Sequence, residues 1–159
     1  MAFGKNIFVT HGINAHVEHP EKAALVAKTR YGTRLRQYDG TNSILLPISV
    51  PVKSGGEWQH WEDVTLNFDV NQFARIDRIV LLLQQEEKGL SNRLTEIPVF
   101  EKTADKAALS NMIQHMFFNI ADKKVFGAAL MQIDVSFIKT PDGYGEVTIL
   151  AANALVDDN

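Results

Sequence analysis

Cysteine is absent from the 159-residue chain, tryptophan occurs only twice, and neither sign of charge is in large excess. The lack of cysteine excludes disulfides, thiolate metal sites and cysteine nucleophiles, so a metal ion would need histidine and carboxylate ligands. The net charge of −3 argues against a protein that binds nucleic acid through a generally basic surface. We therefore do not expect nucleic acid as its partner.

Long apolar runs are also missing. No segment approaches the roughly 20 apolar residues that a membrane-spanning helix needs, and the first residues lack the apolar stretch of a secretory signal. We expect a soluble, cytoplasmic protein that carries no cleaved signal peptide and makes no membrane contact.

Common catalytic signatures do not occur. The chain has no Gly-x-Ser-x-Gly elbow, phosphate-binding loop or dinucleotide fingerprint, and its one Gly-Gly pair, at 55–56, is not followed by a lysine and threonine. The carboxylates are scattered along the chain. These absences favour a non-catalytic protein.

What the chain does contain is a repeated alternation of apolar and polar residues, which is typical of half-buried strands. The predicted strands cover residues 44–52, 64–70, 76–83, 92–100, 129–137 and 146–152. The last two flank the turn sequence Thr140-Pro141-Asp142-Gly143, which predicts a hairpin. A chain of this length forms one core, so we predict a single domain over 1–159, an antiparallel, jelly-roll-like β-sandwich of about eight strands.

One segment departs from this alternation. Apolar residues between 109 and 120 recur at helical spacing, which predicts one short amphipathic helix. Its apolar face would pack on a sheet as core or would bind a partner. Together with Pro47 and Pro51, which place their strand near a sheet edge, this face makes a homo-oligomer a reasonable hypothesis.

Four short motifs occur in order along the chain. They are Thr10-His11-Gly12, Val17-Glu18-His19-Pro20, Tyr31-Gly32-Thr33 and Pro47-Ile48-Ser49-Val50-Pro51. This order resembles a family of small bacterial β-sandwich proteins that carry Trp-x-His-Gly, Val-Glu-x-Pro, Gly-Trp-Gly-Thr and Pro-x-Pro. The chain departs from that pattern at Val9-Thr10 and at Arg30-Tyr31. The resemblance implies a β-sandwich fold and implies no activity.

Three of the five histidines cluster near the N-terminus. His11, His16, Glu18 and His19 are residue types that bind zinc, iron or manganese, so they form a candidate metal site. In an extended strand, however, neighbouring side chains point to opposite sides, and the cluster would converge only through a turn at Pro20. The alternative is a set of solvent-facing or hydrogen-bonded histidines, and we expect no cofactor.

A second cluster is cationic. Lys28, Arg30, Arg34, Arg36 and Tyr38 all stand at even positions, so one extended strand would place them on one face. Such a row could bind an anionic ligand, with a tyrosine stacking on a ring. In the alternative, the arginines pair with carboxylates across strands, each exposed pair contributing about 0.2 to 1 kcal/mol.

Both tryptophans lie in the acidic segment 57–63. Trp58 and Trp61 could form a platform for carbohydrate, because a flat ring meets the apolar face of a sugar. At this odd spacing one ring would face outward and the other the core.

The residues favour a non-catalytic binding or self-assembly module. The first alternative is a module that binds carbohydrate or an anion through Arg30, Arg34, Arg36, Tyr38, Trp58 and Trp61. The second is a small metal-dependent enzyme that uses the segment from His11 to His19.

Overall fold

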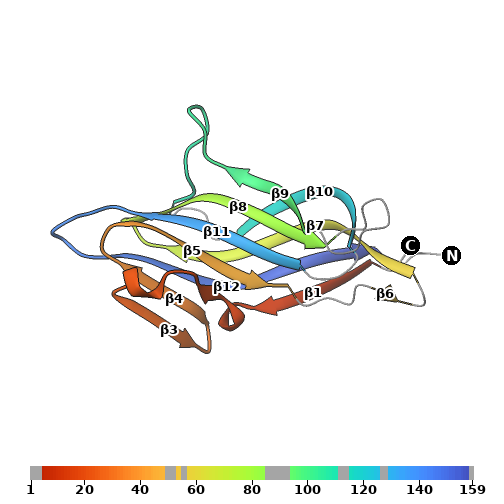
Figure 1. The fold of residues 1–159 in the computed structure, drawn as a ribbon, viewed down its shortest axis with the longest axis horizontal. Coiled ribbons are helices and arrows are strands. Elements are labelled where there is room, and N and C mark those ends of the chain that lie inside the picture. Colours follow the sequence, from red (N-terminus) through yellow and green to blue (C-terminus); the bar gives the residue numbers. More distant parts are fainter. Residues whose placement is uncertain are drawn as a thin grey trace.

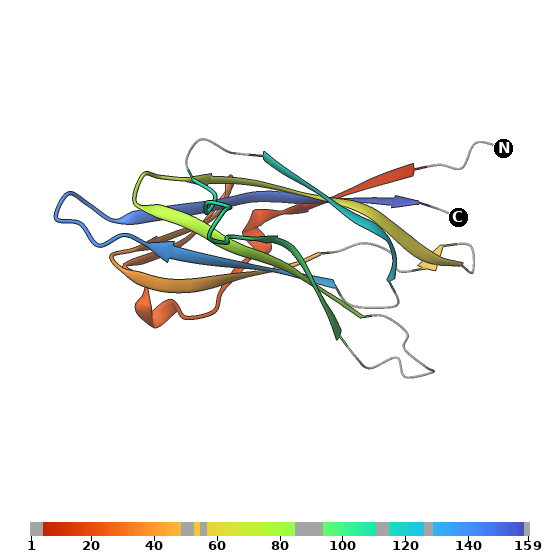
Figure 2. The same cartoon turned by 90° about the horizontal axis from the view of Figure 1, so that it is seen from above.

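The computed structural model describes residues 5–48, 53–54, 57–84, 94–110, 115–125 and 129–157. Two antiparallel sheets pack face to face in a β-sandwich (Figures 1 and 2), which confirms the predicted fold class. Sheet A has the order β10-β7-β12-β4-β3, with β1 paired to β12 and β6 to β7. Sheet B has the order β2-β5-β11-β8-β9.

The strands of sheet A are β1 (Lys5–His11), β3 (Leu25–Thr29), β4 (Gly32–Gln37), β6 (Lys53–Ser54), β7 (Glu57–Val70), β10 (His115–Val125) and β12 (Gly145–Asp157). Those of sheet B are β2 (His16–Val17), β5 (Gly40–Pro47), β8 (Ala74–Gln84), β9 (Leu94–Glu101) and β11 (Ala129–Phe137). Two short 3-10 turns, η1 (Gly12–Asn14) and η2 (Pro20–Lys22), lie on either side of β2.

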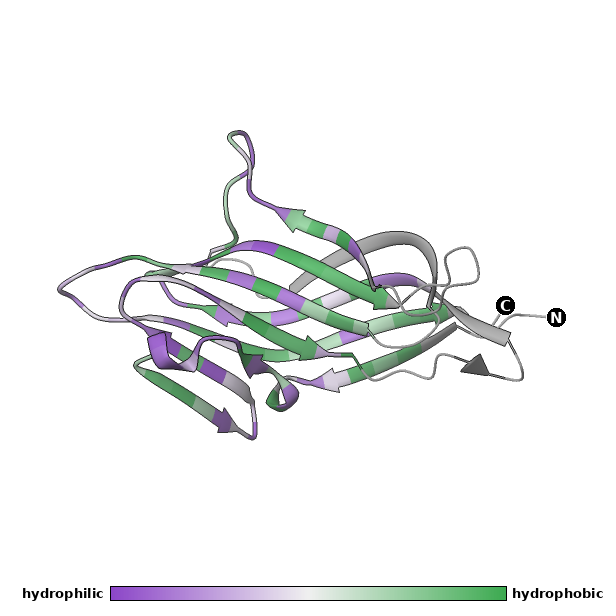
Figure 3. Ribbon diagram, viewed as in Figure 1, coloured by the Kyte–Doolittle hydropathy of each residue, from purple (hydrophilic) through white to green (hydrophobic). Residues whose placement is uncertain are grey.

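The core fills the space between the sheets. Strand β11 shows why, since its odd-numbered residues from Ala129 to Phe137 are buried and the residues between them are half-exposed. The same alternation appears as apolar and polar bands along the strands in Figure 3. Trp61 and Phe68 of β7 are among the largest fully buried side chains.

The helix predicted within 109–120 is wrong. Leu109 is buried and forms a backbone bridge with Ile76, and residues 115–125 form β10, whose backbone pairs with β7. Residues 111–114 lie outside the described part of the chain. Pairing with an existing strand satisfies backbone groups that a helix would have satisfied internally, so the tertiary partner overrides the apolar spacing.

The predicted C-terminal hairpin is also wrong, although both of its strands exist. β11 belongs to sheet B and β12 to sheet A, so the connection 138–144 crosses from one sheet to the other. The turn itself forms, with a bridge between Thr140 and Gly143. A connection of this length exceeds a tight hairpin loop, which leaves the second strand free to join the other sheet.

The predicted strand 44–52 is described only in part. Pro47 is the last residue of β5. On one side of β5 it lies opposite Leu130 of β11. On the other side the short β2 pairs only with Ile44 and Leu45. Pro47 therefore lies where β5 has no described neighbour on its second side, which suits a residue without an N–H donor. Residues 49–52, including Pro51, lie outside the described residues.

Strands β1 and β4 share one side of β12. β4 pairs with Gly145–Ile149, β1 pairs with Ala151–Asp157, and the ladder is irregular between these two stretches. At this junction Gly12 and Gly32 approach the Ile149 carbonyl so closely that a Cβ atom on either glycine would overlap it. The glycines of two sequence motifs thus allow two chain segments to meet on one strand.

Candidate functional site

His11 is used within the fold. Its Nδ1 accepts a hydrogen bond from the backbone N–H of Ile13 at 2.9 Å, and its Nε2 lies 2.9 Å from the carbonyl oxygen of Arg30. Both bonds form when the proton is on Nε2. The imidazole therefore ties η1 to the β3–β4 turn.

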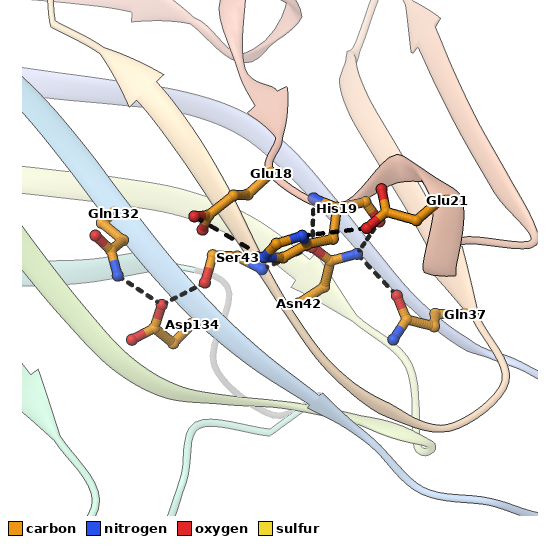
Figure 4. Close-up of polar contacts among 8 residues, drawn as sticks. All are labelled: Glu18, His19, Glu21, Gln37, Asn42, Ser43, Gln132 and Asp134. Carbon is orange, nitrogen blue, oxygen red and sulfur yellow. Dashed lines mark hydrogen bonds and ion pairs between the residues drawn. The ribbon is translucent and has the colours of Figure 1, made fainter.

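His19 is held at a different place. Its backbone N–H donates to Asn42 Oδ1 at 3.1 Å, and its carbonyl accepts from Asn42 Nδ2 at 2.9 Å (Figure 4). Its ring lies 3.2 Å from Glu21 and 3.9 Å from Glu18. A backbone hydrogen bond, and secondarily the imidazole of His19, lowers the pKa of the exposed Glu21 carboxyl.

The predicted metal ligands therefore do not converge. His11 lies at the end of β1 in sheet A, whereas His16 is exposed on β2 in sheet B. Among the described residues, no three histidine or carboxylate side chains are placed to hold one metal ion.

The cationic row is broken by a turn. Arg30 and Tyr31 connect β3 to β4, and Gly32 follows with φ = 138°. Lys28 consequently lies on a different strand from Arg34 and Arg36, and its Nζ donates to the backbone carbonyls of Ile13 in η1 and of Ala15. Arg30 stacks 4.8 Å from the ring centroid of Tyr31. The row of four cations predicted from the sequence does not form.

Part of that row remains intact. Arg34 and Arg36 are half-exposed on the outer face of β4 and pair with Glu146 of β12, at 3.5 Å and 2.9 Å. Tyr38 follows β4 and meets Tyr144 edge to face, with ring centroids 5.7 Å apart. The cross-strand ion pairs match the alternative reading of the arginines.

The tryptophans differ in what the structure shows. Trp61 is fully buried in the core, so a surface ligand does not reach its ring and the predicted platform is wrong for this residue. Its ring faces inward because the ladder with β12 shifts register between Asp63 and Trp61, which moves Trp61 onto the same face as Val64, although strict alternation would place it on the outer face. The side chain of Trp58 lies outside the described residues.

A cleft of about 390 Å³ opens on the outer side of sheet B. Polar side chains dominate its lining, and they come from strands β5, β11 and β8 and from the segment around η2. The lining residues are His19, Lys22, Thr41, Asn42, Ser43, Asp77, Gln132, Asp134 and Val135.

Asp134 is the centre of the polar contacts in this cleft. Its Oδ1 accepts hydrogen bonds from Ser43 Oγ at 2.7 Å and from Gln132 Nε2 at 3.0 Å (Figure 4). Nearby, Asp77 accepts from Ser136 at 3.2 Å and forms an ion pair with Lys102 at 3.2 Å. Within the described residues Asp134 has no cationic partner, so this carboxylate keeps acceptor capacity for a ligand.

An aliphatic surface borders the cleft on the same face. The register places Gln132 beside Leu45 and Val80, and in the next row Leu130 beside Pro47 and Leu82. These residues occupy the outward positions of their strands. Leu45, Leu82 and Leu130 are half-buried and Pro47 is exposed, whereas Val80 is buried and adds no accessible surface. The outer face of sheet B therefore combines a polar half with an apolar half.

Sequence reasoning missed this cleft. Ser43, Gln132 and Asp134 were readable as outward residues of alternating strands, but their pairing across β5 and β11 required the register of two distant segments. No local signal joins residue 43 to residue 134.

Neither a protein-family model nor a curated protein sequence matches the chain. Similar solved structures include the xylan-binding module CBM15, with a TM-score of 0.48 and 13% identity over 96% of this chain and 97% of that one. A CBM61 module in complex with β-1,4-galactotriose has a TM-score of 0.44 and 10% identity, covering 92% and 86%. A CBM4 module has a TM-score of 0.40 and 13% identity, covering 92% and 88%.

The structure also bears on membrane insertion. Within its described residues, no helix is both long enough and apolar enough to span a bilayer.

Proposed function

We propose that the protein is a non-catalytic carbohydrate-binding module and that the cleft on sheet B holds the ligand. The observation that carries this proposal is the convergence of Ser43, Gln132 and Asp134 in one cleft. All three side chains stand on paired strands, so their positions are fixed before a ligand arrives. Such preorganisation reduces the entropic cost of binding.

The chemistry of the lining suits hydroxyl groups. Each sugar hydroxyl donates one hydrogen bond and accepts others, and the cleft offers a carboxylate acceptor beside amide and hydroxyl groups that do both. Hydrogen bonds to a charged group such as Asp134 contribute about 1.5 to 3 kcal/mol each. The volume of about 390 Å³ lies within the range of small-molecule sites, roughly 300 to 1,000 Å³.

The apolar border supports the same ligand class. A pyranose ring has polar edges and an apolar face, so it matches a surface on which Leu45 and Leu130 lie next to Gln132. A purely ionic ligand would leave these aliphatic groups exposed. We therefore favour a neutral oligosaccharide that lies across the strands of sheet B.

Isothermal titration calorimetry with xylohexaose, cellohexaose, mannohexaose and β-1,4-galactotriose tests this proposal. We expect at least one of these sugars to bind, and Asp134→Asn and Gln132→Ala each to weaken it by about tenfold, which corresponds to 1.4 kcal/mol. Arg34→Gln, on the opposite sheet, is the matched control and should bind as the parent does. Unchanged affinity in both cleft variants would refute the proposed site.

A further inference from the structure

We propose that the outer face of sheet A carries a second site, one that binds an acidic glycan. The site consists of Arg34, Arg36, Tyr38, Tyr144 and Glu146, which we call the tyrosine–arginine stripe. It lies on the opposite sheet from the cleft, so this inference does not rest on the proposed function.

The stripe is continuous because of the ladder between β4 and β12. Arg36 lies opposite Glu146 and Arg34 opposite Thr148. The last ladder pair joins Gln37 to Gly145, and the next residue on each side is a tyrosine. The alternation of strand residues therefore brings Tyr38 and Tyr144 to the same face as the arginines, and their rings meet edge to face at 5.7 Å.

The stripe retains unused donors. Arg36 donates from Nε at 3.0 Å and from Nη2 at 2.9 Å, both to Oε2 of Glu146. Arg34 reaches Oε1 of the same carboxylate only through Nε, at 3.5 Å. One carboxylate thus faces two guanidinium groups, and among the described residues the Nη atoms of Arg34 have no partner. A guanidinium fork of this kind fits a second carboxylate.

A third cation lies close to the stripe, since the Nζ of Lys139 is 6.0 Å from the centroid of the Tyr38 ring. Carboxylates are present as well. Glu146 and Asp69 occupy neighbouring ladder positions, and Asp39 and Asp142 flank the two tyrosines in the chain. An anionic group at Arg34 would therefore be bound by the guanidinium fork at short range, and not by a net positive charge of the surface.

The aromatic end of the stripe is fixed by Asn71. Its Nδ2 donates to the Tyr144 carbonyl at 2.8 Å, and its Oδ1 accepts from the backbone N–H groups of Glu146 and Phe73, each at 3.0 Å. Tyr38 and Tyr144 are 39% and 47% exposed, so their rings are accessible to a ligand. A fixed, accessible tyrosine provides a stacking surface for a sugar ring at low entropic cost.

These features point to a sugar that carries a carboxylate. The tyrosine would pack on the pyranose face while the Arg34 fork binds the acid group of the same or the next ring. A neutral sugar would accept from the guanidinium only through hydroxyl oxygens, without the bidentate charged pairing of a carboxylate. A simple anion would leave the tyrosines unused.

Titration with hexagalacturonate and with its methyl-esterified form tests the inference, since esterification removes the charge and keeps the rings. We expect the acid form to bind at least about tenfold more tightly and to weaken between 50 and 300 mM salt. Equal binding of the two forms, or no binding of the acid form, would overturn the inference. So would tighter binding of a single-stranded oligonucleotide than of hexagalacturonate.

Variants locate the site. Arg34→Gln and Tyr38→Ala should each weaken hexagalacturonate binding by fivefold or more, a change of about 1 kcal/mol. Arg34→Lys keeps the charge without the fork and should fall between Arg34→Gln and the parent. Asp134→Asn should leave this affinity unchanged, whereas the same variant disables the cleft in the proposed function. The two proposals therefore fail independently.

Discussion

The hydroxyl of Thr33 donates a hydrogen bond of 2.7 Å to the carbonyl oxygen of Gly12. This bond joins β4 to η1, and Lys28 Nζ donates to the same hydroxyl at 3.1 Å. His11-Gly12 and Gly32-Thr33, the cores of two motifs recognised in the sequence, therefore contact each other. The motif residues His11, Gly12, Gly32 and Thr33 fasten the N-terminal segment to the β3–β4 hairpin, which gives them a role in stability.

Replacing Thr33 by valine should test that role. The change keeps the shape of the buried side chain and removes the hydroxyl, so we expect a loss of about 1 to 3 kcal/mol in the free energy of unfolding. Urea denaturation measures it. Thr148→Val on the half-exposed face of β12 is the control, and equal stabilities of the two variants would contradict the role.

Alanine at Gly12 or Gly32 should be far more damaging. Its Cβ would overlap the Ile149 carbonyl in either case, and Gly32 also has φ = 138°. We expect a loss of about 4 kcal/mol or more, or failure to fold, seen as soluble yield and thermal midpoint. Gly40→Ala is the control, since its φ of 77° costs about 1 to 2 kcal/mol but its nearest neighbour lies 3.8 Å away.

Asn42 should stabilise the segment around Pro20. The buried side-chain amide of Asn42 forms hydrogen bonds with the backbone N–H and the carbonyl of His19. It also donates to Gln37 Oε1 at 2.9 Å. We expect Asn42→Ala to cost about 2 to 3 kcal/mol, because buried partners lose their hydrogen bonds. Hydrogen exchange should show the His19 amide losing protection. If that amide stays as protected as in the parent, the segment is held by other contacts.

The stability of the protein should depend on pH through Lys28. Desolvation lowers the pKa of this ammonium group below 10.5, so near that pH the unfolded chain binds more protons than the folded one. Stability should therefore rise with pH in the window between the lowered pKa and 10.5. An arginine side chain stays charged throughout this window, so the Lys28→Arg variant should lack this rise in stability. Urea denaturation at pH 8 and at pH 10 measures the free energy of unfolding of the parent and of Lys28→Arg. The same change with pH in both proteins would contradict the assignment to Lys28.

Trp61 should act in the core and not in ligand binding. We expect Trp61→Ala to cost about 3 to 5 kcal/mol. Trp61→Phe should cost less, since the structure gives the indole N–H no hydrogen-bond partner among the described residues. Calorimetric titration of the folded Trp61→Phe variant should give the sugar affinity of the parent. A specific loss of affinity would return this residue to the list of candidate ligand contacts.

Much of the secondary structure was readable from the sequence because burial on one face of a strand imposes a period of two. Strands 64–70, 76–83 and 129–137 were located in this way, and so was the β-sandwich class. The same reasoning failed for the segment 109–120, where it predicted a helix. The spacing of apolar residues indicates which side chains can be buried, but it does not indicate which element they pair with. Here the free side of β7 was available, and β10 pairs with it.

The candidate sites show where local information ends. Alternation along β4 correctly placed Arg34 and Arg36 on one face, since that relationship lies within one strand. Strand register alone brought Ser43 beside Asp134, and Tyr38 beside Tyr144. The sequence by itself determined which residues face outward, because the hydrophobic effect acts on each strand locally. Only the tertiary structure decided which outward residues meet, because that depends on pairing between strands that are distant in the sequence, as Arg36 of β4 and Glu146 of β12 are.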